Sequence, residues 1–334
     1  MGRRIGSDLD AAAADGGIED RQENGTDRSF CWRRRTTTWN PRRRREKVVL
    51  RHVHPGGSMT TMSGKVCLVT GGTSGIGRET AARLAELGAT VVVVGRDAER
   101  GQAAVKAIRY RAPSAGVDLL TADMSSLAEV RRVAAEVLEK YPRLDVLDNN
   151  AGVIVLKRQL TVDGYETMFA VNHLAPFLLT SLLRERLVDS APARVITVSS
   201  NVHNSARRVP WDELASGEPS YPLSKLANIL FTVELAKRLT GTGVVANCLH
   251  PGLIRTQLGR EASGVAKLLI AAAKPFMGTV QTGAATPVYL ASAPEAAEVT
   301  GGYFFRGKQI EPSPLARDPE AAARLWALSE ALVA

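Results

Sequence analysis

The stretch TGGTSGIG, from Thr70 to Gly77, decides the fold of this chain, because it follows a short β-branched run and leads into a helical pattern over residues 78–87. Glycines let the main chain approach a pyrophosphate closely, and the amides and dipole of a helix N-terminus favour its negative charge. The spacing alone also fits an ordinary glycine turn. Its place between a strand and a helix favours a dinucleotide site, with these candidate contacts: Gly71, Thr73, Ser74, Gly75, Ile76 and Gly77.

Beyond this loop, short β-branched runs alternate with helical stretches, which is typical of strands joined by crossover helices in a parallel sheet. The run VVVV at residues 91–94 is apolar on both faces, as expected for a strand covered by helices on each side. We therefore predict an α/β fold: one domain over residues 59–334, with a doubly wound parallel sheet of about seven strands and helices on both faces, which the family resemblance described below identifies as a Rossmann fold. The predicted strands are residues 65–70, 90–95, 117–121, 144–149, 194–199, 244–249 and 303–305.

The first 58 residues differ from the rest. Residues 1–57 hold 13 Lys plus Arg and 8 Asp plus Glu, a net of +5, which leaves +4 of the total +9 on the remaining 277 residues. They show no helical or strand periodicity, so we expect a disordered, arginine-rich leader. It is a solvated tail, a targeting peptide, or upstream sequence read from a start codon placed too early. Its acidic residues argue against a transit peptide, and its few aromatic residues argue against nucleic-acid binding.

Composition limits the class of protein further. The three cysteines, Cys31, Cys67 and Cys248, are too few and too scattered for a disulfide framework or a thiolate metal cluster. No apolar run approaches the roughly 18 to 20 residues that span a bilayer. We therefore expect a soluble, cytoplasmic protein without a metal, a nucleic-acid partner or stable membrane insertion.

The end of the second predicted strand bears on the cofactor. A carboxylate there would accept hydrogen bonds from an adenosine ribose, whereas an arginine would pair with a 2′-phosphate. The strand ends in Gly95-Arg96, and Asp97 is expected to cap the next helix. NADP(H) is therefore favoured, with NAD(H) as the alternative. After the third strand, Asp123 could accept a bond from the adenine amino group or cap the helix that begins near Leu127, and Met124 lies next to it.

Tyr221 and Lys225 stand four residues apart in YPLSK and so share one helix face. A free tyrosine has a pKa of about 10, and a neighbouring ammonium stabilises its phenolate. With such a neighbour, Tyr221 could exchange a proton with a carbonyl or alcohol oxygen. An exposed tyrosine and lysine on an amphipathic helix remain the alternative for the pair taken alone.

Two more polar positions complete the candidate site. Ser199 and Ser200 end the run VITVSS, and the carboxyl ends of parallel strands are where open α/β sheets bind ligands. We choose Ser200 as the donor to a substrate oxygen, with a serine that caps a turn as the alternative. Asn172 lies in the apolar segment MFAVNHLAPFLL and needs partners if buried, so it could position Lys225 through water.

Together these motifs resemble the short-chain dehydrogenase/reductases over residues 62–333. The residues that carry the resemblance are the glycine loop, Asn149-Asn150-Ala151-Gly152, Asn172, Ser200, Tyr221 and Lys225. Further matches in VNHLAPFLLT, SKLANILFTVELAKRL, LHPGLIRTQL and LARDPEAAARLWALSEAL indicate the retinol dehydrogenase-like branch.

The resemblance implies roles for these positions. Tyr221 would be the catalytic acid/base, Lys225 would also hold the nicotinamide ribose, Ser200 would orient the carbonyl and Asn172 would maintain a proton relay. The other cofactor contacts it implies are Asn150, Ala151, Gly152, Pro251, Gly252, Ile254 and Thr256. It also implies a homodimer or homotetramer built on the helices that contain Asn172 and Tyr221.

The chain departs from the family at two places. Asp148 replaces an apolar residue before Asn-Asn-Ala-Gly, so it must reach a partner or lie at an exposed strand end. The stretch between Ser200 and Tyr221 is longer than in compact members, and its Trp211 could line a substrate pocket or pin the loop. Substrate selection is expected in this loop and in residues 253–281, whose apolar run could be a lid, a core helix or a membrane-attached segment.

The sequence therefore predicts an NADP(H)-dependent oxidoreductase acting on CH-OH groups. It would transfer a hydride between nicotinamide and an alcohol or carbonyl substrate, retinoid-like or another hydrophobic aldehyde or ketone. The alternative is a catalytically silent, nucleotide-sensing regulator with the same fold. Such a regulator would be expected to lose Tyr221 or Lys225, and both are present.

Overall fold

The computed structural model describes residues 60–218, 220–254 and 277–334. Eight strands form one sheet in the order β3-β2-β1-β4-β5-β6-β7-β8. All neighbouring strands are parallel except β7 and β8, which are antiparallel. The strands are β1 Val66–Thr70, β2 Thr90–Gly95, β3 Val117–Thr121, β4 Val146–Asn149, β5 Ala193–Val198, β6 Val244–Leu249, β7 Tyr303–Phe305 and β8 Lys308–Ile310.

This arrangement confirms the predicted α/β class and the doubly wound parallel sheet. The seven predicted strands are present, with ends that differ by at most two residues, and β8 is an eighth strand that the pattern did not indicate. The chain order reverses beside β1, which lies between β2 and β4. Such a switch point separates the loops that follow two adjacent strands and so opens a crevice for a ligand.

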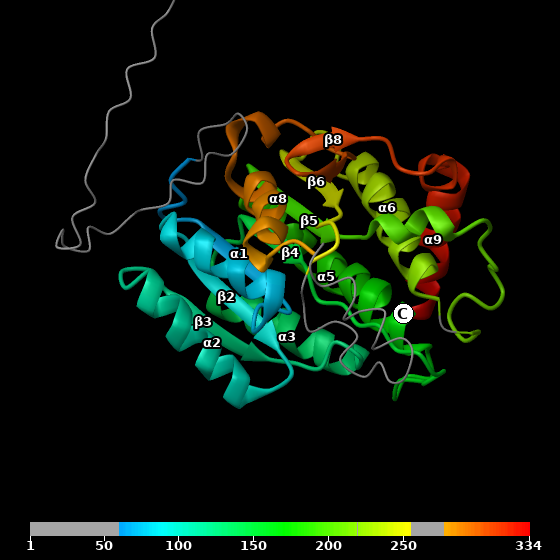
Figure 1. Cartoon of the computed structure of the whole chain (residues 1–334), viewed down its shortest axis with the longest axis horizontal. Helices are drawn as coiled ribbons and strands as arrows, with labels where there is room; N and C mark the ends of the chain where they lie inside the picture. Colours follow the sequence, from blue (N-terminus) through cyan, green and yellow to red (C-terminus); the bar gives the residue numbers. More distant parts are fainter. Residues whose placement is uncertain (1–59, 219, 255–276) are drawn as a thin grey trace, which may run out of the picture. The chain divides into compact units, whose positions relative to one another are not determined.

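Helices cover both faces of the sheet (Figure 1). Their bounds are α1 Gly75–Glu86, α2 Ala98–Arg111, α3 Leu127–Lys140, α4 Thr167–Phe169, α5 Ala175–Asp189, α6 Tyr221–Arg238, α8 Val280–Ser292 and α9 Pro319–Leu332. Between them lie a π-helix, η1 Ala170–Leu174, and the 3-10 helices η2 Asn201–Ser205, η4 Pro294–Ala296 and η5 Pro314–Arg317. No helix within the described residues is long and apolar enough to cross a membrane.

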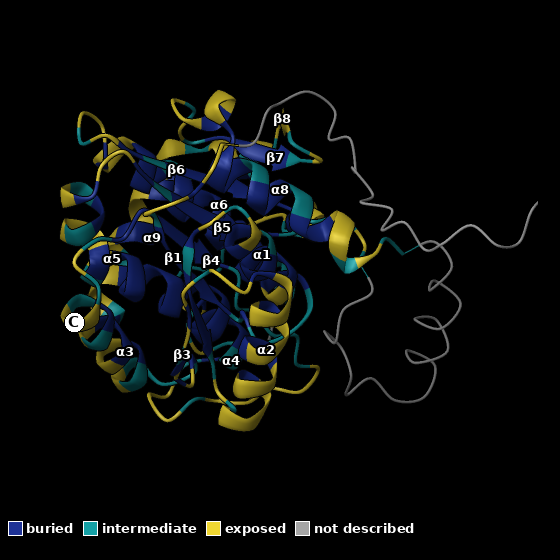
Figure 2. Ribbon diagram, turned by 90° about the vertical axis from the view of Figure 1, so that its left-hand side faces the viewer, coloured by how far each residue is buried: buried dark blue, intermediate teal, exposed yellow. Residues whose placement is uncertain are grey.

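Alternate side chains of the strands pack into two hydrophobic cores, one on each face of the sheet. In β2, Val91 and Val93 pack with residues of α1, α2 and α8, whereas Val92 and Val94 pack with residues of α3, α5 and α6. Alternate residues of a strand point to opposite faces, so a run of four valines supplies both cores. Figure 2 shows the buried strands between helices whose outer faces are exposed.

The helix α9 forms an outer layer over α6, and the two lie side by side in Figure 1. The Trp326 ring stacks on Phe231 at 5.9 Å between centroids and meets Phe177 edge-on at 4.9 Å. On its other side the Arg238 guanidinium lies 4.3 Å from the Trp326 ring. A subunit contact through the helices that carry Asn172 and Tyr221 must therefore form beside α9 or include it.

Candidate active site

The glycine loop is held by the segment that follows β4. The Asn150 amide donates to the carbonyl oxygens of Thr70, at 2.9 Å, and Gly71, at 3.4 Å. The Thr70 hydroxyl accepts from the main-chain N–H groups of Asn150 and Ala151, both at 3.1 Å. Asn150 therefore shapes the loop by bonding to its main chain.

Two glycines of the loop are required by this close packing. Gly71 has a φ of +64°, in the left-handed region that favours glycine. A Cβ at Gly77 would lie 2.3 Å from the Asn150 amide nitrogen and 2.5 Å from the Gly71 oxygen. The helix α1 begins here after Ser74 and carries no acidic residue in its first turn. Its N-terminus thus offers main-chain amides and a positive dipole without a side-chain anion beside them.

Arg96 is exposed directly after β2. The end of this strand lies against the glycine loop, since a Cβ at Gly95 would be 2.4 Å from the Thr73 methyl carbon. Asp97 caps α2 as predicted, because its carboxylate accepts from the Arg100 N–H at 3.0 Å. The structure thus places an exposed guanidinium at the rim of the loop.

Asp123 and Met124 follow β3, where the Ala122 N–H donates to the Gly95 oxygen at 3.1 Å. The Asp123 carboxylate is exposed and accepts from the N–H and the hydroxyl of Ser125, at 2.9 and 2.8 Å. The cap of α3 is Ser126, so the alternative of Asp123 as the cap is wrong. Its turn with Ser125 leaves the carboxylate at the surface after the strand.

The Tyr221 phenol and the Ser200 hydroxyl meet where α6 begins beside the end of β5. Burial raises the pKa of Tyr221 to about 12, and the nearby Ser200 hydroxyl acts in the opposite direction. The Ser200 hydroxyl oxygen also accepts from the Val202 N–H at 3.3 Å, so this serine caps the turn that follows β5. The bond leaves the hydroxyl hydrogen free to act as the predicted donor, so the two roles are compatible. The sequence led us to expect that the Lys225 ammonium lowers the pKa of Tyr221. Without a bound cofactor or substrate, burial has the larger influence and raises this pKa.

Lys225 is buried one turn along α6, with its ammonium 5.6 Å from the centre of the Tyr221 ring. The ammonium donates to the Val198 oxygen at 2.9 Å, and burial lowers its pKa to about 8. The Ser199 hydroxyl donates to the Lys225 oxygen at 2.7 Å, which ties the end of β5 to α6. Of the two serines, then, Ser199 has a structural partner and Ser200 faces Tyr221.

Asn172 lies within the π-helix η1 and is fully buried. Its amide group exchanges hydrogen bonds with the main chain of Val153, at 2.8 and 3.0 Å, and donates to the Ser224 hydroxyl at 3.0 Å. A Cβ at Gly152 would lie 3.2 Å from the Asn172 oxygen and 3.4 Å from the Lys225 nitrogen. Asn172, Gly152 and Lys225 are therefore neighbours, and single-turn π-helices are frequent at functional sites.

The segment after β6 contributes Pro251, Gly252 and Ile254, all half-buried. Gly252 has a φ of +86°, and a Cβ there would lie 3.2 Å from the Phe305 ring. Thr256 lies outside the described residues, as do the leader and most of the apolar run in residues 253–281. The predictions for a lid and for the leader therefore stay predictions.

The sequence predicted that Asp148 either reaches a partner or lies at an exposed strand end, and the structure shows neither. It is fully buried within β4, and neither carboxylate oxygen has a hydrogen-bond partner among the described residues. Burial raises the pKa of this carboxyl to about 8. Its main-chain oxygen accepts from the Thr70 hydroxyl at 3.2 Å, so the strand end is neither frayed nor exposed. Asp148 is thus a neutral acid at the centre of the sheet.

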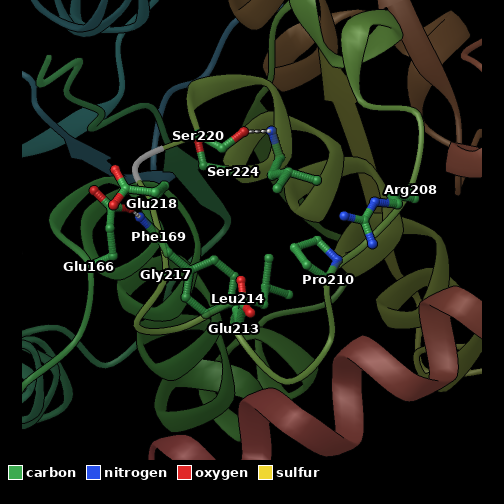
Figure 3. Close-up of a pocket in the computed structure, with 11 residues that line it drawn as sticks. Glu166, Phe169, Arg208, Pro210, Glu213, Leu214, Gly217, Glu218, Ser220 and Ser224 are labelled. Atoms are coloured by element: carbon green, nitrogen blue, oxygen red, sulfur yellow. Dashed lines mark hydrogen bonds between the residues drawn. The ribbon is translucent and has the colours of Figure 1, made fainter. Parts of the chain in front are cut away.

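A cavity of about 230 Å³ lies under the loop between η2 and α6 (Figure 3). Its lining includes Leu214 and Glu213 of the loop, Phe169 of α4, Ser220, which caps α6, and Ser224 of α6. Tyr221 and Lys225 are on a different face of α6 and do not line it.

The indole of Trp211 contacts the Arg324 guanidinium of α9, 4.7 Å from the ring. Trp211 is also absent from the cavity lining. The contact with Arg324 ties the loop to α9, which agrees with the second of the two sequence interpretations, and a place for Trp211 in a substrate pocket stays a prediction.

Comparison with known proteins assigns the chain to a family. The sequence model of the short chain dehydrogenases matches residues 65–264. Human retinol dehydrogenase 14 is 41% identical over 316 residues, which cover 88% of this chain and 94% of that protein. Human retinol dehydrogenase 12 is 42% identical over 273 residues, 80% of this chain and 86% of that protein. The chain belongs to the short-chain dehydrogenase/reductase family.

Solved structures agree with the fold. A putative uncharacterized protein from Mycobacterium paratuberculosis superimposes with a TM-score of 0.67 at 33% identity, covering 83% of this chain and 98% of that one. The Pseudomonas aeruginosa RhlG/NADP complex has a TM-score of 0.60 at 31% identity, covering 73% of this chain and 94% of that one. The chain is thus a retinol dehydrogenase-like oxidoreductase of the Rossmann type.

Proposed function

We propose that this protein is an NADP(H)-dependent oxidoreductase that interconverts a hydrophobic alcohol and its aldehyde or ketone, with Tyr221 as the acid/base. The observation that carries the proposal is the buried Lys225 ammonium 5.6 Å from the centre of the Tyr221 ring, at the end of β5 where Ser200 follows the strand. These groups stand at the carboxyl ends of β5 and the neighbouring strands, on the edge of the sheet that also carries the glycine loop.

The residues present fit a dinucleotide. The loop held by Asn150 brings the main chain of Gly71 and Gly77 to the N-terminus of α1, which would take the pyrophosphate. The exposed Arg96 at the loop rim would pair with a 2′-phosphate, which supports NADP(H) over NAD(H). A solved relative from Burkholderia cenocepacia, 28% identical with a TM-score of 0.61, is described as a complex with NADP. When bound, the cofactor supplies or accepts the hydride.

The protein's own groups manage the proton. With a pKa of about 12, the phenol of Tyr221 holds its proton at neutral pH and can donate it to an oxygen that gains negative charge during reduction. The Ser200 hydroxyl oxygen accepts from the Val202 N–H, so its own hydrogen can point at the same substrate oxygen. These protonation states favour carbonyl reduction near pH 7.

Lys225 and Asn172 would support this step. The ammonium near the phenol stabilises the phenolate that remains after the proton has left. Asn172 is bonded to Val153 and Ser224, so it fixes the turn of α6 between Tyr221 and Lys225. The proposed relay therefore begins at an asparagine whose own side chain is held rigidly.

The proposed substrates are hydrophobic alcohols and carbonyl compounds, with retinoids among them. The printed names of the human relatives, retinol dehydrogenases 12 and 14, support this class. The large apolar side chains Leu156 and Leu253 are exposed after β4 and β6, on the same edge of the sheet as Tyr221. An apolar surface at this edge suits a substrate with a long hydrocarbon body.

Purified full-length protein should be mixed with all-trans-retinal, a steroid ketone, a straight-chain aldehyde and an aromatic aldehyde, each with NADPH and with NADH. Loss of nicotinamide absorbance would measure turnover, and we expect it with at least one apolar carbonyl and NADPH. Tight NADPH binding without turnover of any of these compounds, or of the matching alcohols with NADP⁺, would instead support the nucleotide-sensing regulator.

A further inference from the structure

His203 lies three residues after Ser200, in the short helix η2, and its side chain is fully buried. Both of its ring nitrogens have partners from distant parts of the fold. The Nδ1 atom lies 2.8 Å from the Ser200 oxygen, and the Nε2 atom lies 3.1 Å from the main-chain nitrogen of Ser313. The imidazole thus joins the proposed catalytic serine to the segment that follows β8.

These partners fix the protonation of the ring. The Ser313 N–H can only donate, so Nε2 must be the acceptor and carry no hydrogen. The Ser200 carbonyl can only accept, so Nδ1 must carry the hydrogen and donate it. Burial lowers the pKa of His203, which agrees with a neutral ring, while the bond to Ser200 acts in the opposite direction.

The ring is also held from the side. Tyr303 of β7 meets it edge-on at 5.2 Å between centroids, with the phenol oxygen 3.4 Å from Nδ1. The His250 ring packs on the other side of Tyr303 at 5.6 Å. His203 therefore rests on Tyr303 of β7, and the His250 ring at the end of β6 supports Tyr303 in turn.

We propose that His203 is a positioning residue: as the neutral Nδ1–H tautomer it braces the main chain of Ser200 against Ser313 and so aims the Ser200 hydroxyl at Tyr221. This inference rests on the proposed function, because it assigns Ser200 a part in the reaction. The hydroxyl oxygen of Ser200 and its carbonyl oxygen both bond within η2, to the Val202 N–H and to His203. A shift of the carbonyl would therefore turn the hydroxyl as well.

The tautomer can be read without any substrate. The full chain has five histidines, so ¹⁵N labelling gives five imidazole patterns, and the one missing in His203→Asn belongs to His203. Long-range ¹H–¹⁵N correlation spectra at neutral pH should show its hydrogen on Nδ1. A hydrogen on Nε2, or on both nitrogens, would overturn the brace.

Ser313 offers a matched pair of variants for the catalytic effect. Ser313→Pro removes the N–H that bonds to Nε2, and the φ of −56° at this position suits proline. Ser313→Ala keeps the N–H and removes only a hydroxyl that has no partner. We expect kcat with NADPH and all-trans-retinal to fall about three- to tenfold in Ser313→Pro relative to Ser313→Ala, with the Kd for NADPH unchanged.

Substitution of the histidine itself gives a rescue test. His203→Phe keeps a ring against Tyr303 but removes the donor, and kcat should fall about tenfold or more. His203→Asn places an amide nitrogen where Nδ1 was and should recover most of that loss. Ser200→Ala separates the two proposals: if it lowers kcat while Ser313→Pro and Ser313→Ala turn over equally, the brace alone fails. Full kcat in Ser200→Ala would remove Ser200 from the reaction and with it the catalytic meaning of the brace, whereas absence of turnover in the wild type would overturn the proposed function.

Discussion

The Lys225 ammonium and the Tyr221 ring lie 5.6 Å apart on one face of α6, and both groups are held away from their ordinary pKa values by burial. The pKa of the lysine falls to about 8 and that of the tyrosine rises to about 12. Both shifts favour the uncharged forms, which is the opposite of an ammonium–phenolate pair at rest. At pH 7 the lysine is still an ammonium and the tyrosine a neutral phenol, so the phenolate charge develops only during the reaction, beside a buried positive charge.

Replacing Tyr221 with phenylalanine removes the proton donor and keeps the ring. We expect kcat for carbonyl reduction to fall by about 10²–10⁴-fold, the usual worth of a positioned acid. The Kd for NADPH, measured by fluorescence, should stay within about twofold because the phenol contacts the reacting oxygen. Tyr110→Phe, at an 88% exposed tyrosine, is the control. Equal turnover in Tyr221→Phe and Tyr110→Phe would remove Tyr221 from the mechanism.

Lys225→Met should lower activity and raise stability at the same time. The folded pKa of about 8 lies below the roughly 10.5 of an unfolded lysine, so burial of the charge destabilises the protein below pH 8. That cost disappears as pH rises from 8 to 10.5. At pH 7 the variant should gain up to about 3 kcal/mol in free energy of unfolding, less what the lost bond to Val198 contributes.

Denaturant unfolding of Lys225→Met at pH 7 and pH 10 measures this gain. The matched control is Lys237→Met, the same change at an exposed position of α6. If Lys225→Met is less stable than the wild type at pH 7, burial of the Lys225 ammonium does not destabilise the folded protein.

Asp148 should make stability fall as pH rises. Its folded pKa of about 8 lies far above the roughly 3.9 of an unfolded aspartate, so between these values the unfolded chain ionises and the folded chain does not. The penalty is absent below pH 4, grows through that window and is complete above pH 8, where it reaches roughly 5 kcal/mol.

The isosteric change Asp148→Asn cannot ionise, so its advantage in Tm over the wild type should widen from pH 5 to pH 8. The exposed Asp212→Asn should show no such widening. A constant difference between Asp148→Asn and the wild type across this window would mean that the carboxyl finds a partner or water.

Arg96→Ala tests the choice of cofactor. A guanidinium pairs with a 2′-phosphate that NADH lacks, so the Kd for NADPH should rise about tenfold while that for NADH changes little. The control Lys106→Ala removes the same charge from an exposed position on α2. Similar weakening of both cofactors would show that Arg96 acts on something they share.

Much of the fold follows from sequence because its signals are local. The glycine loop and the valines of β2 predict a turn, a helix and a strand within about 25 residues of chain. The structure confirms these elements at the predicted places. The strand β8 gives no such signal, since two of its three residues are exposed and it pairs only along one edge. Whether such a short segment forms a strand depends on the neighbouring strand with which it pairs more than on its own residues.

The features that escaped sequence reasoning depend on distant partners. His203 looks like one polar residue in a polar loop, and its partner Ser313 is 110 residues away. The sequence around Asn172 gives no sign of a π-helix, and the Asn172 side chain bonds to Val153 and Ser224, which are 19 and 52 residues away. For Asp148 the expectation that a buried carboxylate must find a partner was wrong, because a neutral acid avoids much of that cost.

The contacts of Trp326 with Phe231 and Phe177 also bear on how the protein is made. Ribosomes synthesise the chain from its first residue, so α6 is complete about 90 residues before the indole of Trp326 that stacks on it. Until Trp326 is synthesised, the rings of Phe231 in α6 and Phe177 in α5 lack the indole that covers them. Chains without α9 should therefore expose an apolar surface, and chaperones should capture fragments that stop before residue 319 more strongly than released chains that include residues 319–332.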